Sequence, residues 1–162
     1  MKKILIIATV LFLASGSAMA QAQPKDEWTL FKEAFHKEKR DLVNEYMKLS
    51  PEQATQFWPL YSEYNQAKGA IGKERLGIID DYAAHLSTLT DDQANDLAKR
   101  LFKNDKSLLS LDQKYFKKLS KAVGGVKAAQ YLQMEQYFTT TVRSAIQEEI
   151  PFIGEIDRAT GH

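Results

Sequence analysis

The residues that could bind a metal are two histidine–carboxylate pairs at helical spacing. His85 follows Asp81 by four positions and His36 follows Glu33 by three, so each pair would lie on one face of a helix. Zinc takes four ligands of this kind, whereas each pair supplies two. An ion pair along the helix surface is the structural alternative. His36 and His85 are therefore candidate zinc or copper ligands that would need a second subunit to complete a site.

Signatures of catalysis are absent from the sequence. The chain has 3 histidines and no cysteine, which removes thiolate nucleophiles, thiolate metal ligands and disulfides. No H-E-x-x-H motif, P-loop, nucleophile elbow or glycine-rich dinucleotide loop occurs. The sequence predicts a protein that is not an enzyme and uses no cofactor.

Aromatic residues recur at helical spacing and could form a binding surface. Six of them are candidates for contact with apolar segments of other proteins: Phe57, Trp58, Tyr61, Tyr64, Tyr131 and Phe138. Aromatic side chains at this spacing ordinarily pack in the core. A few long helices can nevertheless leave one apolar face uncovered. Such a face binds another helix, a second subunit or an unfolded chain.

Two similar helix-start signals occur forty positions apart. The first comprises Leu49, Ser50 and Gln53, and the second comprises Leu89, Thr90 and Gln93. In each, a hydroxyl residue precedes a glutamine by three positions, which is the arrangement of a capping box. This chemistry accounts for the start of a helix, so the motif residues are expected to be structural.

Residues 1–20 have the features of a secretory signal peptide. Lys2 and Lys3 form the charged start, residues 4–14 the apolar stretch, and residues 18–20 an A-x-A cleavage site. An uncleaved membrane anchor is the alternative, although the apolar stretch is short for a span. The absence of cysteine excludes lipid attachment at the cleavage site. We therefore predict export to the periplasm and no membrane span after cleavage.

Residues 21–162 are long enough for a single domain with a modest core. Without the two signal lysines, 20 of the 22 basic side chains remain against 21 acidic ones. Proteins that bind nucleic acid usually carry a strong basic excess. The charge balance therefore argues against a nucleic-acid partner.

The apolar periodicity is helical along the whole exported chain. It predicts an all-α domain of four helices, over about residues 27–49, 51–86, 90–121 and 126–149. Pro59 should kink or break the long second helix near Trp58. Gly124 and Gly125 should end the third helix, and Pro151 should end the fourth. The tail, residues 154–162, has little to bury and is expected to be disordered.

The signal peptide, the helical chain and the paired capping motifs together resemble the Spy/CpxP-like periplasmic proteins with tandem L-T-x-x-Q motifs. The first motif here has Ser50 in place of threonine. The resemblance implies a hairpin-based fold of four helices that pairs as an antiparallel, cradle-like dimer. It also implies ATP-independent binding of unfolded envelope proteins and a role in envelope stress. Some relatives restrain a sensor kinase, and others bind zinc, nickel or copper through histidine or cysteine positions that this chain largely lacks.

We therefore expect a periplasmic homodimer that holds apolar segments of client or partner proteins without ATP. Its expected partners are unfolded or envelope proteins, or a sensor kinase. Two alternatives stay open: a regulatory module that binds zinc, nickel or copper, and a purely structural helical protein.

Overall fold

The computed structural model describes residues 38–148 and Ile150. Its elements are a helical segment over residues 38–47, α3 (Pro51–His85), the 3₁₀ turn η2 (Leu86–Thr88), α4 (Asp91–Val123) and α5 (Gly125–Glu148). No strand occurs in this part of the chain, which confirms the all-α prediction. The predicted signal peptide, the first part of the first helix, His36 and the tail lie outside the described residues.

Both long helices begin with a capping box. The Ser50 N–H donates to Gln53 Oε1 at 3.1 Å, and the Gln53 N–H donates to Ser50 Oγ at 3.3 Å. Thr90 and Gln93 exchange the same two bonds, at 2.9 and 3.3 Å. These bonds satisfy N–H groups that have no partner inside the first turn of a helix. Local chemistry alone thus sets the starts of α3 and α4.

Proline at position 59 does not interrupt α3. The helix runs unbroken from Pro51 to His85, so the alternative of a break near Trp58 is wrong. Pro59 removes one backbone donor, the one that would reach the Thr55 carbonyl. The helix persists because its neighbouring turns are packed: Phe57 and Tyr61 on either side are buried. Tertiary packing here outweighs the local cost of proline.

The first helix ends two residues earlier than predicted. Helical residues stop at Met47, and Lys48 has a left-handed backbone with φ of 44°. The last carbonyls of this helix are satisfied from α5, because Lys127 Nζ donates to the Met47 carbonyl and Gln130 Nε2 donates to the Tyr46 carbonyl at 2.7 Å. These partners lie about eighty residues away in sequence, so the residues around position 47 alone do not predict where this helix ends.

The main core lies at the end of the fold that holds the α4–α5 connection. It joins residues 43 and 47 to the first half of α3, the last part of α4 and the start of α5. Its buried members are Val43, Met47, Phe57, Tyr61, Tyr64, Tyr115, Leu119, Val123, Ala128 and Tyr131. Gly124, with φ of 89°, makes the sharp turn between α4 and α5. This turn brings α5 back onto the hairpin.

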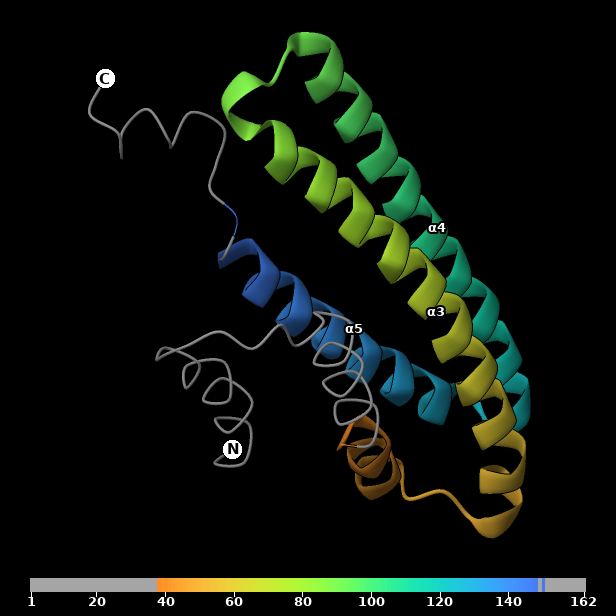
Figure 1. The fold of residues 1–162 in the computed structure, drawn as a ribbon. Helices are drawn as coiled ribbons and strands as arrows, with labels where there is room; N and C mark the ends of the chain where they lie inside the picture. The colour runs from red at the N-terminus through yellow and green to blue at the C-terminus, as the bar shows by residue number, and fades with distance from the viewer. Residues whose placement is uncertain (1–37, 149, 151–162) are drawn as a thin grey trace, which may run out of the picture. The chain divides into compact units, whose positions relative to one another are not determined.

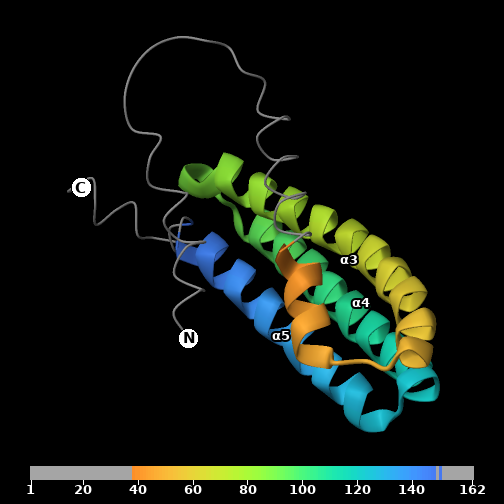
Figure 2. The ribbon, with the colours of Figure 1, turned by 90° about the horizontal axis from the view of Figure 1, so that it is seen from below.

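Figures 1 and 2 show α3 and α4 side by side as one long antiparallel hairpin, with α5 returning from its open end, where α3 begins and α4 ends. The three helices differ in length: α3 has 35 residues, α4 has 33 and α5 has 24. At 1.5 Å per residue, α5 is about 14 Å shorter than α4. It therefore covers the far end of the hairpin only in part. None of the helices in the described part is long and apolar enough to cross a bilayer.

Candidate functional site

Four of the six predicted binding aromatics lie in the core. Phe57 is fully buried, and Tyr61, Tyr64 and Tyr131 are each at most 6% exposed. The rings of Phe57 and Tyr131 contact edge to face with centroids 5.2 Å apart, and those of Tyr64 and Tyr131 do so at 5.9 Å. Such geometry adds to the stability that burial gives. A partner protein cannot reach these four rings in this conformation.

Polar partners surround the hydroxyls of Tyr64 and Tyr131, two of the three tyrosines in this cluster. That of Tyr131 accepts from Asn65 Nδ2 at 3.4 Å. Tyr64 donates to Asp112 Oδ1 at 2.6 Å. Burial raises the pKa of Tyr64 far above its usual range, and the negative charges of Glu135 and Asp112 raise it further. Burial likewise raises the pKa of Tyr131, and the charge of Glu135 adds to the effect. Both hydroxyls are therefore neutral near neutral pH and do not act as acid–base groups there.

Trp58 and Phe138, the other two predicted binding residues, lie at the edge of the core. Both are partly buried and pack against it. The Trp58 ring lies 5.2 Å from that of Tyr61, and the Phe138 ring lies 6.1 Å from that of Tyr137. Only these two of the six aromatics have surface that another molecule could touch.

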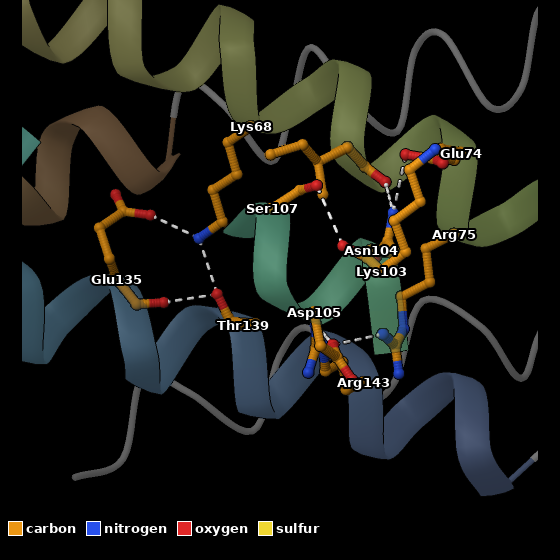
Figure 3. A network of polar contacts seen from close by, with 11 residues as sticks. Lys68, Glu74, Arg75, Lys103, Asn104, Asp105, Ser107, Glu135, Thr139 and Arg143 are labelled. Carbon is orange, nitrogen blue, oxygen red and sulfur yellow. Dashed lines mark hydrogen bonds and ion pairs between the residues drawn. The ribbon is translucent and has the colours of Figure 1, made fainter. Parts of the chain in front are cut away.

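A polar junction ties α5 to α3 in the middle of the fold (Figure 3). Lys68 Nζ lies 2.7 Å from Glu135 Oε2 and 2.7 Å from Thr139 Oγ1. Glu135 is 2% exposed, and Lys68 is 19% exposed. A buried carboxylate needs such a partner, because removal from water strongly disfavours an isolated charge. The junction therefore fixes where α5 lies on the hairpin.

A second junction joins all three helices through one carboxylate. Asp105 Oδ1 on α4 accepts from Arg75 of α3 and from Arg143 of α5, at 2.8 Å each (Figure 3). All three side chains keep some contact with solvent, so each ion pair contributes at most about 1 kcal/mol. The junction matters more for geometry, since it holds two arginine side chains in defined positions.

Beyond this junction, an apolar groove of about 530 Å³ lies between the far end of the hairpin and the last turns of α5. Its apolar lining comes from all three helices and from residues that flank them: Ile78, Ile79, Tyr82, Leu89, Ala94, Leu97, Ala98, Leu101, Ile146 and Ile150. Arg75, Arg143 and Gln147 supply its polar part. Ile78 is buried, while most other lining residues are half-buried.

The groove follows from the lengths of the helices. Apolar residues continue at core positions of α3 and α4 up to the tip of the hairpin, for example Ile78 and Leu97. A third helix that is shorter by about 14 Å cannot cover them all. Half-buried isoleucine and leucine side chains therefore remain in contact with solvent. Exposed apolar surface of this kind is typical of an interaction site.

The predicted metal ligands do not come together on α3. The His85 ring places Nδ1 2.8 Å from the Asp81 backbone carbonyl, and the Asp81 carboxylate pairs with Arg100 at 2.7 Å. Within the described residues, no group of three or more histidine, cysteine, aspartate or glutamate side chains could hold a metal ion. His85 and the Asp81 carboxylate thus form no pair of ligands here.

Sequence reasoning expected an uncovered apolar face but assigned it to aromatic residues. The structure places the face on aliphatic residues instead, and Tyr82 is the only ring among the described residues that line the groove. The signal that could have located it is the difference in length between the predicted hairpin helices and the last helix. Arg75 and Arg143 carried no local signal, since Asp105 brings them together only in the folded chain.

The chain matches no family model, and comparison with the curated proteins and with the solved structures gives no match either.

Proposed function

We propose that this protein binds apolar segments of other proteins in the groove between the hairpin tip and α5, and holds them without ATP. The observation that carries the proposal is the aliphatic groove itself, open to solvent and built from three helices. The predicted signal peptide and the resemblance to Spy/CpxP-like proteins support a place for this activity in the periplasm. The expected clients are unfolded envelope proteins.

The size of the groove suits a few side chains of a client. Removing one leucine side chain from a core leaves a cavity of about 150 Å³. A groove of about 530 Å³ therefore holds about three side chains of that size. Each fully buried one contributes about 1.5–3 kcal/mol, while association itself costs about 4–15 kcal/mol. Binding would thus be weak and reversible, which suits a protein that releases clients without an energy source.

The chemistry of the lining favours clients of varied sequence. Aliphatic side chains contact any apolar group without directional demands, so they select by hydrophobicity and not by sequence. At the polar side, each guanidinium of Arg75 and Arg143 has five N–H groups, and the ion pair with Asp105 uses one nitrogen of each. These positioned donors could bind backbone carbonyls of a client segment.

The test is suppression of client aggregation. A chemically denatured model protein is diluted into buffer with increasing amounts of purified protein and no nucleotide, and light scattering is recorded. We expect suppression at near-stoichiometric ratios. Ile146→Asp, which places a charge in the groove, should abolish suppression. The matched control is Val126→Asp, because Val126 is 84% exposed, lies on the same helix and does not line the groove.

Two results would contradict the proposal. One is scattering that the protein leaves unchanged at every ratio. The other is equal suppression by Ile146→Asp and Val126→Asp, which would move the binding surface elsewhere. Circular dichroism of both variants confirms that each keeps the helical fold.

Dimerisation and export are separate predictions from the sequence. Sedimentation equilibrium of residues 21–162 tests the homodimer. Fractionation of cells that express the full chain tests export and cleavage after Ala20.

A further inference from the structure

A row of lysines follows the outer face of α4. At 100° per residue, seven positions between residues 99 and 121 fall within an arc of about 80°. Six of the seven are lysines, and together they form what we name the lysine stripe: Lys99, Lys103, Lys106, Lys114, Lys117 and Lys121. The seventh position is Ser110. All six lysine side chains are exposed, and the stripe is about 33 Å long.

No carboxylate of the described residues forms an ion pair with the stripe. The other cations of α4 contrast with it, because Arg100 pairs with Asp81 at 2.7 Å and Lys118 with Glu63 at 3.0 Å. Asp105 is also turned away, since it binds two arginines on the inner side of the helix. The fold thus neutralises the charges that flank the stripe and leaves the stripe positive.

Two apolar side chains lie beside the stripe. Phe102 is 71% exposed and Leu109 is 58% exposed. Both lie on the same side of the lysines, about 40–60° from the edge of the stripe, and seven residues separate them by about 10 Å along the helix. What distinguishes these two side chains is their place beside a row of positive charge, where they could enter an apolar layer next to an anionic surface.

We propose that the lysine stripe, with Phe102 and Leu109, is a docking surface for a membrane rich in anionic lipid. A straight row of positive charge on one side of a helix fits a plane of lipid phosphates. The two apolar side chains would enter the boundary between headgroups and acyl chains. An acidic protein or a nucleic acid could pair with the lysines, but it would bury less of the two apolar side chains. The lipid surface therefore fits both parts of the face.

This surface goes beyond the proposed function, because it lies on the other side of α4 from the groove. The groove residues Leu97 and Leu101 point about 160° from Lys99 around the helix. A protein docked through the stripe would present its groove away from the bilayer. Docking and client binding could then occur together.

The test is co-sedimentation of the purified protein, residues 21–162, with lipid vesicles. We expect binding to vesicles of phosphatidylglycerol and phosphatidylcholine, no binding to phosphatidylcholine alone, and weakening as salt rises. Each lysine near an anionic surface contributes about fivefold to affinity. The double variant Lys106→Gln/Lys117→Gln should therefore bind about 30-fold more weakly. Lys48→Gln/Lys73→Gln removes the same charge from outside α4 and should bind almost as the parent does.

The apolar pair separates a membrane from an acidic polymer. Phe102→Ser should weaken vesicle binding at least several-fold and leave binding to soluble polyglutamate unchanged. The proposal is overturned if the vesicles do not bind, if the two lysine variants behave alike, or if polyglutamate binds as tightly as the vesicles while Phe102→Ser has no effect. Circular dichroism establishes that each variant is folded, so a loss of binding cannot come from unfolding.

Discussion

The ion pair between Lys68 and Glu135 gives the sharpest test of how α5 is held on the hairpin. Lys68→Met keeps the apolar stem of the side chain but removes the ammonium 2.7 Å from Glu135 Oε2. The carboxylate, 2% exposed, would then lose the Lys68 ammonium in the interior. Breaking a buried pair by removing one partner typically costs about 3–5 kcal/mol. The free energy of unfolding should therefore fall sharply at neutral pH.

Protonation sets an upper limit to this loss. A carboxyl that has lost the Lys68 ammonium can bind a proton. Holding an ordinary glutamic acid protonated at pH 7 costs about 3.7 kcal/mol, from about 2.7 pH units at about 1.36 kcal/mol each. At pH 5 the same step costs only about 1 kcal/mol. We therefore expect Lys68→Met to cost about 3 kcal/mol at pH 7 and about 1 kcal/mol at pH 5. Adding Glu135→Gln should recover most of the loss at pH 7.

Urea unfolding followed by far-ultraviolet circular dichroism measures these differences at the two pH values. The matched control is Lys73→Met, an exposed lysine on the same helix, which should change the free energy of unfolding by less than about 0.5 kcal/mol. The reasoning is refuted if Lys68→Met costs as little as Lys73→Met. A loss that is equal at both pH values, or that Glu135→Gln deepens, would equally show that the buried charge is not its cause.

Three further predictions concern the caps, the glycines of α3 and the buried tyrosines. Gln53→Ala should lower the free energy of unfolding, measured with urea, by about 1–2 kcal/mol, and Gln93→Ala should lower it by about half as much. The difference is expected because Gln53 Nε2 also donates to the Val123 carbonyl at 3.1 Å. Equal losses for the two variants would count against a contribution from this added bond. Three glycines of α3 have no atom within 4 Å of where an added Cβ would lie. Replacing any one of them by alanine should raise the free energy of unfolding by about 0.5–1 kcal/mol, and an unchanged or lower melting temperature would contradict this prediction. These glycines are Gly69, Gly72 and Gly77. Because the folded-state pKa values of Tyr64 and Tyr131 are raised, the stability that depends on their neutral hydroxyls is complete below about pH 10 and is lost as the pH rises further. Their ultraviolet tyrosinate signal should therefore appear only together with loss of helix, and ionisation before unfolding would show that they are not buried.

Much of the helical framework could be predicted because its signals are local. Ser50 and Thr90 each precede a glutamine by three residues, and those short-range bonds start α3 and α4 where expected. Gly124 likewise ends α4 through its own backbone geometry. Pro59 shows the limit of such signals: a local rule allowed a break, and packing on both sides of it keeps the helix whole.

The candidate sites depended far more on tertiary structure. Periodicity shows that Phe57 and Tyr131 share an apolar face with their neighbours, but not which helix covers that face. The same periodicity continues through Leu97, which lines a groove because none of the described helices covers it fully. A side chain is buried only when the apolar face of its helix packs against the apolar face of another helix. Whether the two faces meet depends on how far each helix extends along the other.

The sequence by itself determined where most helices start and end, the absence of thiol chemistry and the spacing of the lysines on α4. These depend on bonds within a few residues or on composition alone. Only the tertiary structure decided that the aromatic cluster is core, that the aliphatic hairpin tip is open, and that Lys118 is paired while Lys117 is not. The physical reason is that burial and charge compensation require groups that are distant in the chain, such as Glu63 and Lys118, to meet in space.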